Sequence, residues 1–147
     1  LRKLSVIMLD VDHFKNINDS YGHQVGDQVL IHLAKTVKDG VRSMDILARY
    51  GGEEFIIICP ETSKEDAAIV GERLRGTLEN SSIQTQRFGR IRITASLGIA
   101  TYPDDAEDER ELIRQADQAM YHAKETGRNK VVLAPNGEEV PKRQAEF

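Results

Sequence analysis

The sequence contains few of the features that would indicate a secreted, membrane-spanning or disulfide-stabilised protein. Its 147 residues include a single cysteine, Cys59, so no intrachain disulfide can form. This fits a reducing compartment, and the apolar surroundings of Cys59 predict a buried structural thiol. No apolar stretch approaches the roughly 18 residues that span a bilayer, and the chain does not begin with a signal-peptide pattern. We therefore expect a cytoplasmic domain, although a longer protein containing it can still carry a membrane anchor.

Blocks of one charge sign are also absent. The 20 basic and 24 acidic residues are interspersed and give a net charge of −4. This balance argues against a general binder of nucleic acid or of anionic membranes, so an anionic ligand must be bound by a local site. A sheet-based RNA binder would need a basic face and sheet aromatics, but aromatic residues make up only 5% and there is no Trp.

The length and the 39% hydrophobic content predict one compact domain. The first apolar strand begins almost at residue 1, so we expect a piece of a longer protein with regulatory sequence upstream. The polar end of the chain has no periodicity and carries two prolines. We therefore predict a domain over residues 1–134 and a disordered tail over residues 135–147.

Apolar periodicity predicts three amphipathic helices. The first has its apolar stripe over 25–37 and ends near Gly40, where glycine suits a left-handed cap. The second has its stripe over 67–78 and begins at a capping box that starts with Ser63. The third has its stripe over 112–123, begins at Asp108 and ends at Gly127.

Apolar runs and alternation predict the strands. Expected strands cover 4–9, 46–50, 55–59, 91–99 and 130–133, with 83–85 pairing near residue 89. The runs on either side of Gly51-Gly52 predict a hairpin whose glycines take positive φ. This order indicates an α+β, ferredoxin-like fold with a mixed sheet covered mainly on one face by helices.

Two acidic segments follow apolar runs. Asp10-Val11-Asp12 ends the first strand, and Gly51-Gly52-Glu53-Glu54-Phe55 forms the hairpin tip. If the fold brings these segments together, four carboxylates share one region and need a cation, for which hard oxygen ligands favour Mg²⁺ over zinc. The alternative is an ordinary acidic loop at a strand end. In a regular strand Glu53 and Glu54 point to opposite faces, so sharing a metal requires a distorted turn.

Several ordered motifs across residues 4–132 resemble the GGDEF domain of bacterial diguanylate cyclases. They are Leu9-Asp10-Val11-Asp12-His13-Phe14-Lys15-Asn16-Ile17-Asn18-Asp19, Tyr21-Gly22-His23 with Gly26-Asp27, Ala48-Arg49-Tyr50-Gly51-Gly52-Glu53-Glu54-Phe55, Ser96-Leu97-Gly98-Ile99-Ala100, and Ala116-Asp117 through Gly127-Arg128-Asn129. Glu53 replaces the aspartate of the family name, a common active variant. The resemblance implies condensation of two GTP into cyclic di-GMP with release of two pyrophosphates. It also implies a homodimer, since each domain supplies one GTP, and an upstream sensory or regulatory domain.

The resemblance also implies roles for individual residues. Asp10, the Val11 carbonyl, Glu53 and Glu54 would bind Mg²⁺ or Mn²⁺, and Glu53 is the candidate general base. Lys15 would lie near the reacting phosphate. The remaining substrate-binding residues would be Phe14, Asn18, His23, Asp27, Lys124 and Arg128. Alone, Asn18 and Asp27 also suit a turn or cap, and Lys124 and Arg128 also suit the C-terminal end of a helix dipole. In the family the metal-binding role belongs mainly to the first aspartate of this motif, so Asp12 is a candidate for a residue that takes no direct part.

Arg42-Ser43-Met44-Asp45 lies where feedback-controlled members of this family carry an inhibitory Arg-x-x-Asp site. Arginine can bind phosphate and stack on guanine, and aspartate can accept guanine N–H groups, so these types suit cyclic di-GMP. Arg73 resembles the arginine that completes the site, but it also suits a solvated helix face. We therefore expect an enzyme with product inhibition, and the alternative is a catalytically silent module that binds GTP or cyclic di-GMP.

Overall fold

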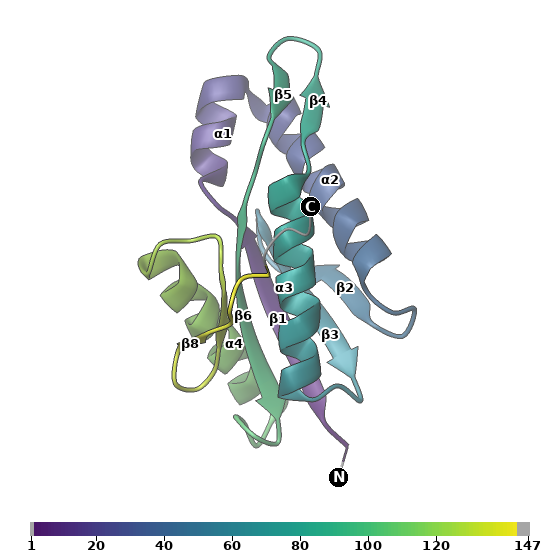
Figure 1. The fold of residues 1–147 in the computed structure, drawn as a ribbon, viewed down its shortest axis with the longest axis vertical. Helices are drawn as coiled ribbons and strands as arrows, with labels where there is room; N and C mark the ends of the chain where they lie inside the picture. The colour runs from purple at the N-terminus through teal and green to yellow at the C-terminus, as the bar shows by residue number, and fades with distance from the viewer. Residues whose placement is uncertain (1, 144–147) are drawn as a thin grey trace.

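The computed structural model describes residues 2–143, which form a central sheet with helices and a separate hairpin (Figure 1). The sheet has six strands in the order β2-β3-β1-β6-β7-β8. Its strands are β1 (Leu4–Val11), β2 (Ile46–Arg49), β3 (Glu54–Pro60), β6 (Ala95–Tyr102), β7 (Val131–Leu133) and β8 (Glu138–Glu139). The helices are α1 (Phe14–Tyr21), α2 (His23–Gly40), α3 (Lys64–Asn80) and α4 (Glu109–Glu125). The hairpin pairs β4 (Ile83–Thr85) with β5 (Gly89–Ile91).

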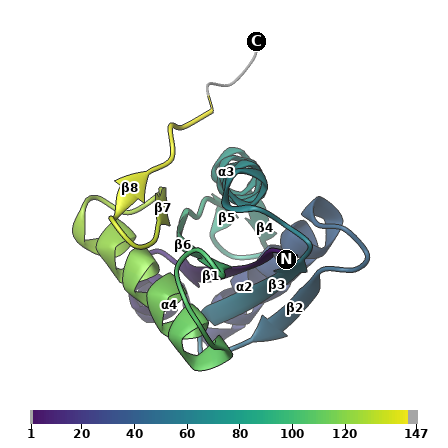
Figure 2. The same ribbon diagram turned by 90° about the horizontal axis from the view of Figure 1, so that it is seen from below.

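Helices cover both faces of the sheet. On β1, Ile7 and Leu9 face one apolar cluster that includes the buried residues of α2 and α3. Val6 and Met8 face a second cluster that includes the buried residues of α4. Figure 2 shows α3 and α4 on opposite sides of the strands. The α+β fold is confirmed, but the expectation of cover mainly on one face is wrong, because alternate residues of the central strands are apolar on both faces.

The central position of β1 determines which residues meet. It pairs antiparallel with β3 and with β6, so that Asp10 lies opposite Glu54 on one side and opposite Ser96 on the other. Directly opposite residues of antiparallel strands point to the same face. Asp10, Glu54 and Ser96 therefore share the face that α4 covers.

The structure corrects three local expectations. Helix α1 was not predicted. Gly40 does not take a left-handed conformation; a Cβ there would lie 2.6 Å from Leu74 Cδ2, so this glycine allows α2 to approach α3. Neither Gly51 nor Gly52 has positive φ. Instead, the amides of Tyr50 and Gly51 both donate to the carbonyl of Glu54 and close a longer turn.

The predicted disordered tail is ordered in part. The amide of Gly137 donates to the Leu133 carbonyl, β8 pairs with β7, and the Val140 amide donates to the Val131 carbonyl. Val140 packs against the main apolar cluster, which explains why a segment without periodicity takes a fixed course. Residues 144–147 of the predicted tail lie outside the described residues. Among the helices of residues 2–143, none combines the length and hydropathy needed to cross a membrane.

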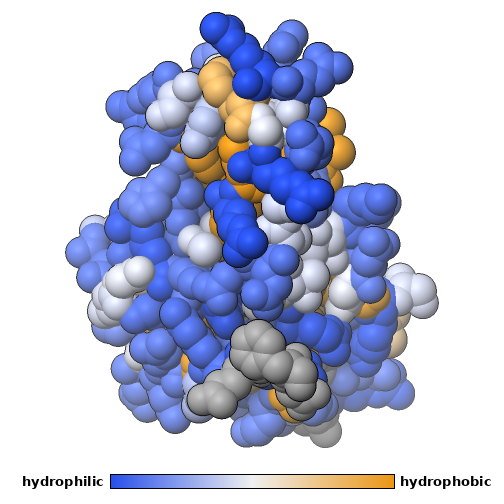
Figure 3. All heavy atoms as spheres, turned by 45° about the horizontal axis from the view of Figure 1, so that its top comes forward, coloured by the Kyte–Doolittle hydropathy of each residue, from blue (hydrophilic) through white to orange (hydrophobic). Residues whose placement is uncertain are grey.

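The β4–β5 hairpin stands at the end of the molecule where α1 lies (Figure 1). Tyr21 of α1 contacts Phe88 of the hairpin edge-to-face, with ring centroids 5.1 Å apart. The Arg87 guanidinium lies 5.4 Å from the centre of the Phe88 ring. Seen from this end, the surface is mostly hydrophilic, with one hydrophobic area near the hairpin (Figure 3).

Candidate active site

Asp10 is a buried carboxylate near the end of the central strand. It is 1% exposed, and Lys124 of α4 donates a hydrogen bond to its Oδ2. Its Oδ1 is buried and has no hydrogen-bond partner among residues 2–143. Burial raises the pKa of Asp10 to about 6, Lys124 opposes this shift, and Glu53 and Glu54 add to it. An unpartnered buried oxygen beside two further carboxylates is suited to bind a cation.

Glu54 begins β3 directly opposite Asp10. Burial, followed by the charge of Asp117 on α4, raises the pKa of Glu54. Glu53 is half-buried in the turn before β3, so it lies outside the regular strand and the alternation rule does not separate it from Glu54. Within residues 2–143, however, no three Asp, Glu, His or Cys side chains gather as a metal-binding cluster. The predicted metal ligands therefore lie near one another but do not form a complete binding site for an ion.

Asp12 has a different environment from Asp10. Its Oδ1 accepts a hydrogen bond from Ser96 Oγ (2.6 Å), and its Oδ2 accepts from Thr94 Oγ1 (2.7 Å) and from the Asn129 amide (3.0 Å). Both oxygens are thus used inside the protein. Asp12 joins β1, β6 and the loop after α4, as expected for a structural residue rather than a ligand.

The predicted guanine-binding residues lie where α1 meets α2. Asn18 Oδ1 is buried and accepts no hydrogen bond within the described part of the chain. It sits against Gly26, where a Cβ would lie 1.9 Å from that oxygen and 3.4 Å from Phe14 Cζ. Asp27 follows Gly26, and His23 precedes Asp27 by four residues on α2, so these two exposed side chains share one helix face. The structure thus brings four predicted substrate residues to one helix pair.

The predicted phosphate-binding cations come from three places. Lys15 is exposed on α1, and Lys124 is in the last turn of α4. Arg128 is exposed in the loop after α4, so the expectation that it shares the helix end with Lys124 is wrong. The helix ends at Glu125, and Gly127, Arg128 and Asn129 all have positive φ.

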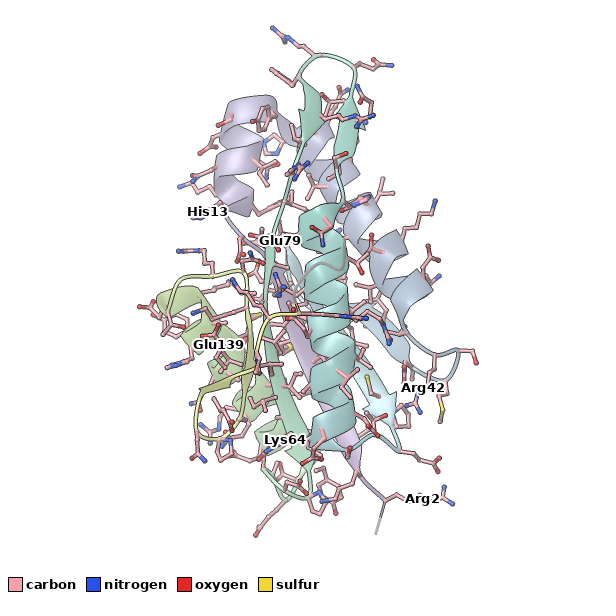
Figure 4. The ribbon with its side chains drawn as sticks, in the orientation of Figure 1. Arg2, His13, Arg42, Lys64, Glu79 and Glu139 are labelled. Atoms are coloured by element: carbon pink, nitrogen blue, oxygen red, sulfur yellow. The ribbon has the colours of Figure 1, made fainter. Side chains whose placement is uncertain are left out.

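The predicted product-binding residues border two adjoining pockets on another side of the molecule. Arg42, in the loop that follows α2 (Figure 4), pairs with Asp45 and also donates to the Pro60 carbonyl. Arg42 and Arg73 line a pocket of about 540 Å³, and Arg42 and Asp45 line a neighbouring one of about 240 Å³. Arg73 also donates to the Gly40 carbonyl (2.5 Å). Two arginines therefore face one pocket.

A family model described as "Diguanylate cyclase, GGDEF domain" matches residues 2–130. The chain belongs to the GGDEF domain family. This GGDEF domain is 45% identical to Diguanylate cyclase A of Treponema denticola over 133 residues, which are 90% of this chain and 36% of that protein. The chain spans between 18% and 38% of the length of three such curated relatives.

Solved GGDEF domains have the same fold. The active GGEEF domain of a diguanylate cyclase from Vibrio cholerae superposes with a TM-score of 0.85 at 34% identity, covering 92% of this chain and 85% of that one. The GGDEF domain of DgcB from Caulobacter crescentus, solved in complex with cyclic di-GMP, also gives 0.85 at 33% identity, covering 90% and 78%. The family match and these similar structures confirm the resemblance.

Two features of this site were missed by sequence reasoning. Thr94 and Ser96 hold the Asp12 carboxylate. The alternation of the β6 segment could have indicated the position of Ser96, since it places Ser96 on the same face as Gly98 and Ala100. Arg75 is 1% exposed and contacts Asn129 of the loop after α4. Arg75 lies three residues before the buried Leu78 and so has the spacing of the buried face, but arginine is usually exposed and was not assigned to the core.

Proposed function

We propose that this GGDEF domain is a diguanylate cyclase that condenses two GTP into cyclic di-GMP and two pyrophosphates. The observation that carries the proposal is Asp10, a buried carboxylate with a free oxygen, directly opposite Glu54 and bonded to Lys124. This places anionic and cationic groups at one point of a domain whose family includes diguanylate cyclases.

The residues present fit Mg²⁺ or Mn²⁺. Asp10 Oδ1 is buried without a partner, and the Glu53 and Glu54 charges act on Asp10. Asp10, the Val11 carbonyl, Glu53 and Glu54 would hold the ion, with water completing the oxygen set that Mg²⁺ prefers. When bound, the ion would offset the charge of the phosphates and polarise the α-phosphorus.

The chain's own residues would bind and orient the substrate. Asn18 and Asp27 would read the guanine edge through an amide and a carboxylate, with Phe14 and His23 bordering the base. Lys15, Lys124 and Arg128 would pair with phosphate oxygens. Glu53 would accept the proton of the 3′ hydroxyl of one GTP. The oxygen of that hydroxyl would bond to the α-phosphorus of the other GTP. Pyrophosphate would leave with the electrons of the broken P–O bond. Two such steps close the ring.

The test is mass-spectrometric detection of cyclic di-GMP after incubation of concentrated protein with GTP and Mg²⁺. We expect product from the native chain and at least a 100-fold lower rate from Glu53→Gln, since that amide cannot accept the proton. ATP in place of GTP should give no cyclic product. If a native chain that is forced to dimerise by a fused coiled coil makes no product, the domain is a silent binding module and the proposal is wrong.

We further propose that cyclic di-GMP inhibits the enzyme at the pockets lined by Arg42, Asp45 and Arg73. Arginines on two elements around about 540 Å³ suit a phosphorylated guanine nucleotide. Arg42→Ala should weaken binding of cyclic di-GMP by at least 10-fold, measured by calorimetry, while turnover without product stays near the native value. An unchanged affinity would count against this assignment.

A further inference from the structure

The loop after α4 is held in an unusual backbone conformation. Gly127, Arg128 and Asn129 have φ values of 119°, 63° and 49°. Left-handed conformations are unfavourable for residues with a Cβ, and two such residues in succession persist only where the surroundings stabilise them. Asparagine tolerates this region better than arginine does. Other residues must therefore hold this loop in its conformation. The same contacts then fix the direction in which the Arg128 side chain projects from the backbone.

Asn129 supplies three bonds that restrain this loop. Its side-chain oxygen accepts a hydrogen bond from Arg75 Nη1 (2.8 Å), and its side-chain amide donates to Glu79. Its backbone amide donates to Asp12 Oδ2 (3.0 Å), within two residues of Asp10. Figure 4 labels Glu79 on α3. A single side chain thus ties the loop to α3, and its amide ties the same loop to the end of β1.

Arg75 anchors this arrangement from inside the protein. It is 1% exposed, and its Nε and Nη2 donate to the two carboxylate oxygens of Glu72 at 2.7 Å each. Such a bidentate pair fixes the guanidinium plane, so the remaining Nη1 points in one direction. That group meets Asn129. A lysine cannot replace this geometry, because one ammonium cannot hold both Glu72 oxygens and reach Asn129 as well.

We infer that Arg75 and Asn129 are positioning residues that hold the 127–129 loop so that Arg128 faces a di- or triphosphate chain. Neither residue is exposed enough to serve as the main phosphate ligand: Arg75 is buried and engaged, and the Asn129 side chain is engaged on both atoms. They act through Arg128, whose exposed side chain starts from the restrained backbone. This inference rests on the proposed function for the place of the phosphates.

Asn129→Gly is the most informative variant. Glycine accepts the left-handed backbone, so the loop can keep its course while the ties to Arg75 and Glu79 are lost. Asn136→Gly, in the exposed turn before β8, is the matched control. Arg75→Lys keeps the charge beside Glu72 but removes the bond to Asn129. Thermal unfolding of each variant establishes that it is folded.

The experiment measures pyrophosphate and GMP affinity by calorimetry with Ca²⁺ present. We expect Asn129→Gly and Arg75→Lys to weaken pyrophosphate binding by about 10-fold, the effect of losing one oriented charged hydrogen bond, with GMP affinity changed less than 2-fold. Arg128→Ala should do the same, and adding Asn129→Gly to it should cause no further loss, because both changes remove one contact.

Three results would overturn the inference: native protein that does not bind pyrophosphate, Asn129→Gly that binds it as tightly as the Asn136→Gly control, or additive losses in the double variant. Cyclase activity is measured separately, so the two conclusions can fail independently. Native protein that binds pyrophosphate through this loop but makes no cyclic di-GMP retains the positioning role and loses the proposed reaction.

Discussion

At the scale of single residues, Asp10 and Asp12 show how burial and partners separate two carboxylates of one short motif. Within residues 2–143, Asp12 accepts from three donors, whereas Asp10 accepts from Lys124 on one oxygen and has no partner on the other. Without the family resemblance, the local sequence gives both residues the same claim to a metal. Their difference depends on Thr94, Ser96 and the 127–129 loop, which are far away in sequence, so no local pattern reveals it.

Asp10 predicts a pH dependence of stability in metal-free buffer. Its pKa rises from 3.8 to about 6 on folding, mainly because it is buried. The folded state therefore binds more protons than the unfolded state between these values, and stability falls as pH rises from about 4 to about 6. The fall attributable to Asp10 is on the order of 3 kcal/mol, at about 1.4 kcal/mol for each unit. Urea unfolding in EDTA should show it.

Asp10→Asn is the matched variant, because the amide oxygen can still accept from Lys124 but the group does not titrate. Its unfolding free energy should lack the fall between about pH 4 and pH 6. Mg²⁺ at pH 8 should stabilise the native protein and leave the variant unchanged, since the ion favours the ionised carboxylate. Parallel pH curves for both proteins would contradict the burial effect.

At the scale of elements, the sequence predicted the long amphipathic helices and most strands, but not α1 or β8. The single strand expected over 91–99 is also wrong, because β5 ends at Ile91 and β6 begins at Ala95 in another sheet. Helix α1 has eight residues and none of them is buried, and His13 enters it in a left-handed conformation without a side-chain cap. The sequence therefore has neither an N-cap residue nor a full apolar stripe to predict this helix. Phe14, Ile17 and Tyr21 do share one side at helical spacing. The predicted turn type at 50–53 was wrong for a different reason. The amides of Tyr50 and Gly51 bond to the Glu54 carbonyl, and the pair of glycines in the sequence does not determine which carbonyl accepts these bonds.

The contact between α1 and α2 gives a prediction for guanine binding. Gly26→Ala places a Cβ 1.9 Å from Asn18 Oδ1, so the Asn18 side chain must move. We expect GMP and GTP to bind at least 10-fold more weakly, measured by calorimetry, because the displaced amide no longer meets the base. This differs from Asn129→Gly, which should spare GMP.

Gly76→Ala is the control for this substitution. Gly76 lies inside α3 and a Cβ there meets nothing within 4 Å. Alanine should therefore stabilise the protein by about 0.5–1 kcal/mol through helix propensity and leave nucleotide binding unchanged. A folded Gly26→Ala protein that binds GMP like the Gly76→Ala control would show that Asn18 does not contact the base.

At the scale of the whole molecule, the fold separates two sites. The β1–β3–β6 end with α1 and α4 carries the candidate reaction centre, and the loop after α2 with α3 carries the candidate product site. Sequence motifs supplied the candidate residues of both sites, because these residues come from short segments. Motifs alone did not show that α4 covers the opposite face from α2 and α3, which is what places Lys124 over Asp10.

One domain has one Asp10, one Asn18 and one candidate guanine-binding helix pair, so the proposed joining of two GTP would require two domains that face each other. For the 147-residue chain we therefore expect a rate per enzyme that rises in proportion to protein concentration in the micromolar range. A fused parallel coiled coil raises the effective concentration of one domain near the other to about millimolar. At an assay concentration of about 1 µM, the fusion should therefore increase the rate by at least 10-fold. It should also remove the dependence of the rate per enzyme on protein concentration. The same fusion carrying Glu53→Gln is the control and should stay inactive. A rate per enzyme that stays constant over a 100-fold dilution, with a monomer on sizing, would rule out reaction across a dimer.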